Sequence, residues 1–306
     1  MRLITRLDFD GIVCSALLLE QNVIDRFLFV HPKDVQDGLV QATCDDVVAN
    51  IPYIPGCGLW FDHHASEEER LRLDDLDFKG ESRPAPSAAQ VIWDYYGGEK
   101  AFGSRFMPLL AAVNKSDSAD LTREEILNPS GWILVSFIAD PRTGLGRFSD
   151  FKKPHYPLMQ EVIQQCRTMS AEEILAQPDM HERVVRYFEQ QKRFEDMLKR
   201  CCKAYGNVLV TNLMDEPTIF AGNRFLVYAL YPEQNIEIRL IWGKDKQNVV
   251  FAVGHSIVNR TSKTNVGKLM LEYGGGGHTK VGTCQVEVSQ WQRVLAELAE
   301  RLRQDG

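Results

Sequence analysis

The tripeptide Asp62-His63-His64 constrains this 306-residue chain more than any other feature. It follows the apolar run Cys57-Gly58-Leu59-Trp60-Phe61, which has the length and composition of a short buried strand. Side chains at the carboxyl end of a strand occupy the edge where open α/β sheets place their binding sites. The tripeptide therefore predicts a metal or ligand site built on a parallel sheet.

The first half of the chain alternates between strand-like and helix-like segments, and Ser87 is suited to cap the second helix. Alternation of this kind predicts an α/β fold with a doubly wound, mainly parallel sheet. Strands are expected at 2–7, 26–30, 46–51 and 58–61, and helices at 11–21 and 86–96.

The pattern changes twice in the second half. It is helical and highly charged from about 171 to 204, and it becomes strand-like after Gly206. We therefore expect a metal-binding catalytic domain over 1–180, a helical connector over 181–205 and a smaller mixed-sheet α/β domain over 206–306. Strands are expected there at 207–213, 224–231, 236–242, 249–255 and 284–288, with an amphipathic helix from Trp291 onward.

Composition narrows the class of protein. The net charge of -7 disfavours a general single-strand nucleic-acid binder, which needs a basic groove. No stretch approaches the roughly 18 consecutive apolar residues of a membrane span. The first residues lack the layout of a signal peptide, and seven cysteines do not form an even disulfide framework. These features favour a cytoplasmic protein with no membrane partner.

A second acidic motif lies near the start, in Leu7-Asp8-Phe9-Asp10-Gly11. Asp8 and Asp10 are two residues apart, so in a regular strand both side chains face the same side. At the junction of a strand and a helix they can converge on a cation, and the helix N–H groups can bind a phosphate. The alternative is a polar turn in which Asp10 only caps the helix.

A third acidic candidate, Asp117, follows the apolar run 109–113. It is either a ligand or a cap at the end of a helix, and nearby Asp120 could support it.

A glycine run, Gly274-Gly275-Gly276-Gly277, precedes His278. Such a run lets a ligand approach the backbone closely, although a flexible turn would have the same composition. Arg260 and Asn265 lie upstream and could contribute side chains to the same site.

The order and spacing of these motifs, Asp8-Phe9-Asp10-Gly11, Asp62-His63-His64 and the glycine run with His278, resemble the DHH phosphoesterase superfamily with its DHH-associated C-terminal domain. The resemblance extends over nearly the whole chain. It implies a metal-dependent phosphohydrolase that binds its substrate in a cleft between two domains. The substrates it suggests are short oligonucleotides, linear dinucleotides or related small phosphoesters, with polyphosphate left open by exopolyphosphatase-related members. It also suggests a homodimer.

The resemblance further implies roles for the acidic and histidine residues. Asp10, His64 and Asp117 would be the core ligands of one divalent metal, and Asp8 would lie nearer a second site. Asp62 belongs to the same metal-binding motif, and His63 would face the scissile phosphate as an acid or hydrogen-bond donor. Carboxylate and imidazole ligands suit Mn²⁺ first, with Mg²⁺ and Co²⁺ as alternatives. Such cations activate water and neutralise the phosphoryl oxygens.

In the C-terminal domain, the resemblance assigns substrate binding to a basic and glycine-rich group. Its members would hold a terminal nucleotide or phosphate through side chains and backbone N–H groups. They are Arg260, Asn265, Gly275, Gly276, Gly277 and His278.

Two residues depart from the family pattern. Arg6 stands where family members carry a histidine ligand, and Asn50 stands where they carry an aspartate that bridges two metals. A guanidinium can hold a phosphate or carboxylate through two hydrogen bonds, as a metal does through coordination. We infer that the site has exchanged one metal for Arg6 and keeps at most one strongly held cation. Arg6 would then act in catalysis beside His63 and Asp117.

The same two departures support a different class of protein. A catalytically eroded nucleotide- or phosphate-binding protein, or a sensor, would also lose metal ligands. The retained Asp8, Asp10, His63, His64 and Asp117 favour the enzyme. Metal content measured beside hydrolysis of a dinucleotide panel discriminates between the two.

Overall fold

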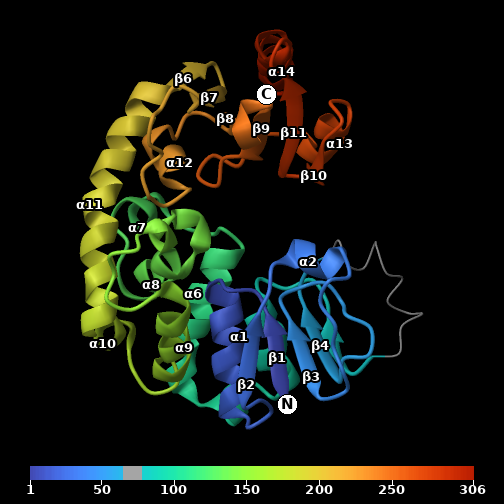
Figure 1. The fold of residues 1–306 in the computed structure, drawn as a ribbon, viewed down its shortest axis with the longest axis vertical. Helices are drawn as coiled ribbons and strands as arrows, with labels where there is room; N and C mark the ends of the chain where they lie inside the picture. Colours follow the sequence, from blue (N-terminus) through green and yellow to red (C-terminus); the bar gives the residue numbers. More distant parts are fainter. Residues whose placement is uncertain (65–77) are drawn as a thin grey trace. The chain divides into compact units, whose positions relative to one another are not determined.

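The computed structural model describes residues 1–64 and 78–306. The chain forms two compact units, the first made of 1–120 and 129–186 and the second of 121–128 and 187–306. Helix α11 (Pro178–Cys201) contributes residues to both units (Figure 1). Over these described ranges, no helix is both long and apolar enough to cross a membrane.

The first unit is built on a five-stranded sheet in the order β2-β1-β3-β4-β5, in which every pairing is parallel. Its central strands are buried along nearly their whole length, as expected for a parallel sheet covered on both faces. This confirms the predicted doubly wound α/β fold. The strands are β1 (Arg2–Thr5), β2 (Arg26–Phe29), β3 (Asp46–Ala49), β4 (Leu59–Asp62) and β5 (Gly80–Ser82).

Helices follow most of these strands, and α1 packs against α4, α6, α8 and α9 (Figure 1). The helices of this unit are α1 (Phe9–Glu20), α2 (Pro32–Gln36), α4 (Ala88–Tyr95), α5 (Glu99–Phe102), α6 (Met107–Asp117), α8 (Gly131–Ala139), α9 (His155–Gln165) and α10 (Ala171–Leu175). Short 3-10 turns lie at η2 (Ser104–Phe106), η3 (Pro141–Thr143) and η4 (Leu145–Arg147).

The strand order creates a switch point between β1 and β3. From β1 the chain crosses to β2 on one side, and it then returns to β3 on the other side. The loops that leave the carboxyl ends of β1 and β3 therefore diverge, and this is where open α/β sheets bind ligands. Arg6 and Asn50 are the first residues after these two strands.

Helix α4 begins at the predicted cap. The Ser87 side chain accepts a hydrogen bond from the backbone N–H of Gln90 over 3.0 Å, in the geometry of an N-cap. Such a cap stabilises a helix by about 1 kcal/mol. It fixes the direction in which the free N–H groups of the first turn point.

The second unit is built on a six-stranded mixed sheet in the order β10-β11-β9-β8-β7-β6. The β7–β8 pair is parallel, and the other pairs are antiparallel. One face packs on α13 and α14 through alternate residues such as Val210, Ile238 and Phe251. The strands are β6 (Cys202–Tyr205), β7 (Val208–Asn212), β8 (Ile236–Trp242), β9 (Asn248–His255), β10 (Gly276–His278) and β11 (Val281–Glu287).

The helices of the second unit are α7 (Arg123–Leu127), α12 (Leu226–Leu230), α13 (Val266–Leu271) and α14 (Trp291–Asp305), with a 3-10 turn η5 (Lys244–Lys246). The sequence patterns predict only α14 as a helix, and they miss or misassign the other three.

The strand predicted over 224–231 is wrong, because this segment forms α12. Periodicity does not distinguish a short continuous apolar run in a strand from one in a helix. The Asn223 side chain accepts a hydrogen bond from the Phe225 N–H over 2.9 Å and favours a turn at that point. The end of the predicted helical stretch also differs, since β6 begins at Cys202.

Candidate active site

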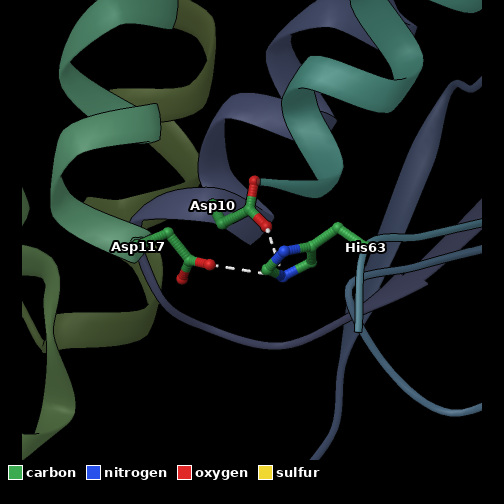
Figure 2. A group of neighbouring side chains, drawn as sticks. All are labelled: Asp10, His63 and Asp117. Atoms are coloured by element: carbon green, nitrogen blue, oxygen red, sulfur yellow. Dashed lines mark ion pairs between the residues drawn. The ribbon is translucent and has the colours of Figure 1, made fainter. Parts of the chain in front are cut away.

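Three predicted site residues converge at the carboxyl end of the parallel sheet. Nε2 of His63 lies 3.2 Å from Oδ2 of Asp117 and 3.8 Å from Oδ2 of Asp10. Potential ligand atoms of all three lie within 4.8 Å of one another. Figure 2 shows the imidazole between the two carboxylates, which come from α1 and the end of α6.

The hydrogen bonding of His63 fits a metal ligand. Its Nδ1 lies 3.2 Å from the carbonyl oxygen of Ala85, an acceptor, so we assign the ring proton to Nδ1. Nε2 then carries a lone pair, and it is buried without a hydrogen-bond partner among the described residues. A lone pair directed between two carboxylates supplies the mixed nitrogen and oxygen donors that divalent cations bind. The residues present therefore fit a divalent metal.

Asp10 is held in place by the start of α4. Its two carboxylate oxygens accept hydrogen bonds from the backbone N–H groups of Ala88 and Ala89, both over 2.9 Å. Burial, followed by the charge of Asp8, raises the pKa of Asp10 to about 7 against the opposing effect of these bonds. A cation at this position would favour the ionised form and offset that cost.

Asp117 is the last residue of α6, and a polar chain connects this helix to α4. Burial and the charge of Asp10 raise the pKa of Asp117 to about 7. One turn before it, Asn114 accepts a hydrogen bond from Ser87 over 2.7 Å and donates to Gln90 over 2.6 Å. The residues that cap and begin α4 thus also fix the helix that carries Asp117.

Asp62 and His64 form a pair beside this group. Nδ1 of His64 lies 2.9 Å from Oδ1 of Asp62, and the backbone N–H of His64 donates to Oδ2 over 3.2 Å. Asp62 is fully buried, whereas the His64 side chain is 45% exposed. Burial would lower the pKa of His64, but the hydrogen bond and charge of Asp62 raise it to about 9. The structure does not bring His64 between Asp10 and Asp117.

Asp8 is engaged by the two residues that depart from the family pattern. Asn50 donates from Nδ2 to Oδ1 over 3.0 Å, and Nε of Arg6 lies 3.1 Å from Oδ2. Asp8 also caps α1 by accepting from the Gly11 N–H over 3.1 Å. Asn50 has φ of +57°, a left-handed conformation that asparagine tolerates better than most residues. The structure thus directs Asp8 to Arg6 and Asn50.

A cation that the sequence reasoning missed lies near this group. Arg142, in η3, donates from Nε to both carboxylate oxygens of Asp140 over 2.8 and 3.0 Å. Burial would lower the pKa of Arg142, but the hydrogen bond and charge of Asp140 and the charges of Asp8 and Asp117 raise it. The available signal was a basic residue in a turn bounded by proline and glycine, directly after an apolar helix.

The glycine run of the second unit packs between β11 and α13. A side chain at Gly275 would lie 2.0 Å from the carbonyl oxygen of Thr283, and one at Gly277 would lie 2.3 Å from that of Val281. Gly276 differs, because a side chain there would meet nothing within 4 Å. Two of the three predicted glycines are therefore required by packing, whatever they contribute to a ligand.

The other predicted residues of this unit lie on β10, at the start of α13 and in the loop before it. His278 is exposed at the end of β10. The Val266 N–H donates to the carbonyl oxygen of Thr279 over 2.9 Å, so the start of α13 lies beside this strand. Asn265 caps α13, and Arg260 donates to the carbonyl oxygen of Ile257 over 3.0 Å in the preceding loop.

Comparison with known proteins gives a full-length relative only among the solved structures. No family model and no curated protein matches it. Among solved structures, a pGpG-specific phosphodiesterase, PggH from Vibrio cholerae, is 46% identical, with a TM-score of 0.88 over 100% of this chain and 99% of that one.

More distant structures share the fold. An exopolyphosphatase-related protein from Bacteroides fragilis is 12% identical with a TM-score of 0.53, over 99% of this chain and 92% of that one. RecJ from Thermus thermophilus in complex with Mn²⁺ is also 12% identical, with a TM-score of 0.51 over 99% of this chain and 52% of that one. The fold, the convergent motifs and the 46% identity to PggH lead to one conclusion: the chain belongs to the DHH phosphoesterase superfamily.

Proposed function

We propose that this phosphoesterase hydrolyses linear dinucleotides, with pGpG as its preferred substrate. The observation that carries the proposal is the 46% identity, over essentially the full length of both chains, to a pGpG-specific phosphodiesterase. The intact group Asp10, His63 and Asp117 supports an enzyme over an eroded sensor.

We further propose that Asp10, His63 and Asp117 hold one divalent cation, with Mn²⁺ as the first choice. This assignment exchanges the roles expected for the two histidines: His63 becomes the ligand, and His64 acts beside it as a protonated donor. The lone pair of His63 Nε2 and the pKa of about 9 for His64 support the exchange. When bound, a cation of this kind lowers the pKa of water and neutralises phosphoryl oxygens.

Arg6, Asp8 and Asn50 would replace a second metal. Arg6 supplies a fixed positive charge beside Asp8, and Asn50 contributes a hydrogen bond where a carboxylate would add negative charge. Arg142 would bind the phosphate that is cleaved, because its guanidinium already interacts electrostatically with Asp8 and Asp117. The guanidinium groups of Arg6 and Arg142 would both stabilise the charge that develops on the phosphoryl oxygens.

In the second unit, Arg260 and His278 would hold a phosphate away from the scissile bond. Gly276 and Asn265 would line that contact, since the space beside Gly276 is open. Gly275 and Gly277 would contribute by allowing β10 to lie close to β11.

The proposal is tested by hydrolysis of a panel containing pGpG, pApA, pCpC, a longer oligonucleotide and polyphosphate, with the bound metal measured on the same sample. We expect Mn²⁺-dependent cleavage of pGpG ahead of the others, and one tightly held metal per chain. Absence of cleavage of any dinucleotide, with metal bound, would favour the sensor instead.

Two further expectations concern the cellular compartment and the oligomeric state. All seven cysteines are free thiols, which agrees with a reducing cytoplasm. The homodimer suggested by the family remains a prediction, which sedimentation of the purified protein would test.

A further inference from the structure

The second unit carries a polar group on the sheet face that α13 and α14 do not cover. Residues directly opposite one another in antiparallel strands point to the same face. Ile238, Val253 and their neighbours form the core face, so Arg239 and Glu237 lie on the other one. Arg239 and Glu237 therefore place a pair of opposite charges on this second face.

The register places this polar group and the glycine run on one face. Arg239 is opposite Ala252, which is opposite Thr283, which is opposite Gly276. The adjacent row runs from Glu237 through Gly254 and Val281 to His278. This part of the face therefore extends from Arg239 on β8 to His278 on β10, with small or exposed residues between them.

Arg239 is held by a bidentate contact. Its Nε lies 3.0 Å from Oε1 of Glu237 and its Nη2 lies 3.2 Å from Oε2, and neither bond uses Nη1. Glu237 is itself buried and accepts from the Thr211 hydroxyl over 2.7 Å. A hydrogen bond with Tyr228 adds a further contact to Glu237. The contacts to Thr211 and Tyr228 hold the Glu237 carboxylate, and this carboxylate fixes the plane of the Arg239 guanidinium.

The Arg239 side chain remains accessible at the open part of this face. It is 25% exposed, Thr283 is exposed, and Gly276 faces open space. At Gly254 the absence of a side chain lets the Tyr228 hydroxyl approach, since an added Cβ would lie 3.3 Å from it. Tyr228 and Glu237 therefore form the support, and their contacts leave the second edge of the guanidinium, from Nη1 to Nη2, available to a ligand within the described part of the chain.

We propose that Arg239 recognises the guanine base of the substrate through this second edge, donating to O6 and N7. The inference rests on the proposed dinucleotide substrate and specifies how its base is selected. Guanine presents two acceptors on one edge, which match the two parallel donors of a guanidinium. Adenine presents an acceptor and a donor there, so an arginine meets one repulsive contact.

A base fits this site better than a phosphate does. Glu237 neutralises the charge of Arg239, which removes most of the attraction for an anion but leaves two N–H donors in place. More exposed cations of the same unit, such as Lys280 and Arg260, are better suited to phosphate. Because its charge is neutralised and its plane is fixed, the Arg239 guanidinium would select a ligand by the positions of the ligand's hydrogen-bond acceptors.

The test compares pGpG with pApA for the unchanged protein, Arg239→Gln, Arg239→Lys and the double variant Glu237→Gln/Arg239→Gln. The double variant avoids leaving a buried, unpaired carboxylate. Arg301→Gln is the matched control, because Arg301 also pairs with a glutamate, Glu272, within the second unit. Both kcat/KM with Mn²⁺ and equilibrium binding in metal-free buffer are measured.

We expect the preference for pGpG over pApA to fall by about 10- to 100-fold in Arg239→Gln and in the double variant. Glutamine pairs with adenine, so pApA should gain as pGpG declines. Arg239→Lys keeps the charge but lacks the planar fork, so it should lose only part of the preference, and metal content and the Arg301→Gln control should stay unchanged. An unaltered pGpG to pApA ratio in all three Arg239 variants would overturn the inference. A guanine preference in binding that depends on Arg239, without hydrolysis, would overturn the proposed function and leave the inference standing.

Discussion

Asn50 donates a hydrogen bond from Nδ2 to Oδ1 of Asp8 over 3.0 Å, across the switch point of the parallel sheet. An aspartate at position 50 could not donate this bond, and its charge would lie against that of Asp8. Arg6 contacts the other oxygen of the same carboxylate over 3.1 Å. Arg6 and Asn50, the two residues that depart from the family pattern, therefore both contact the Asp8 side chain.

This meeting predicts coupling between Arg6 and Asn50. Arg6→His should lose the cation without gaining a firm second metal, and Asn50→Asp should pair with Arg6 and impair substrate binding. The double variant should bind a second Mn²⁺, so the effects of the two changes should not add. Elemental analysis of the four proteins gives the stoichiometry. Two tightly held metals in the unchanged protein would contradict the idea.

Asp117→Asn should abolish firm metal binding while the fold persists, since the lost charge is local to the site. Loss of even an outer partner lowers metal affinity by about 10- to 100-fold, and loss of a ligand should exceed this. Titration with Mn²⁺ measures the change. Asp150→Asn, at an exposed aspartate paired with Arg186 in the same unit, is the control; equal losses in both variants would remove Asp117 from the metal site.

The gain in folding stability that a bound metal provides should increase with pH. The pKa values of Asp10 and Asp117 are raised to about 7 in the metal-free protein, from about 3.9 in an unfolded chain. The folded state therefore binds these protons more tightly, and the stability they contribute is full below about pH 4 and is lost as the pH rises through about 7. A bound cation needs both carboxylates ionised, so its affinity rises over the same window.

Melting temperatures with and without Mn²⁺, taken across that pH window, test this expectation. The shift caused by the metal should be small at low pH and should grow toward pH values above about 7. A shift of constant size would contradict it, and Asp117→Asn should flatten the dependence.

Arg142→Lys should lower kcat/KM for the dinucleotide while leaving metal content unchanged, because lysine retains the charge but cannot form the bidentate contact. We expect a loss of at least about tenfold, corresponding to about 1.4 kcal/mol. Arg105→Lys, an exposed arginine paired with Glu20 in the same unit, is the control. A fall in metal content instead would indicate a structural role.

Arg260→Ala and His278→Ala should weaken binding of phosphorylated ligands, with the largest difference at low ionic strength, where contacts between charges are least screened. Metal content should stay constant. Arg293→Ala removes an exposed arginine of α14 paired with Glu297 and serves as the control. Unchanged affinity for each phosphorylated ligand in both variants would return the glycine run to a purely structural role.

The sequence by itself determined the parallel sheet and its site edge. Alternating apolar segments specify strands and helices locally, and candidate site residues such as Asp10 and Asp62 lie at or just after the ends of strands whose carboxyl ends must share one edge. The departures at Arg6 and Asn50 were visible for the same reason, because each stands in a short motif of fixed spacing.

Only the tertiary structure decided which side chains meet. His63 and His64 are adjacent and chemically alike, and the direction of the chain after β4 sends His63 to Asp10 and His64 back to Asp62. Arg142 interacts electrostatically with Asp8 although 134 positions separate the two in sequence, so the local turn pattern around Arg142 could not show which group it serves. Arg239 and His278 share a face because three strand pairings set their register, and register depends on contacts that a local sequence window does not contain.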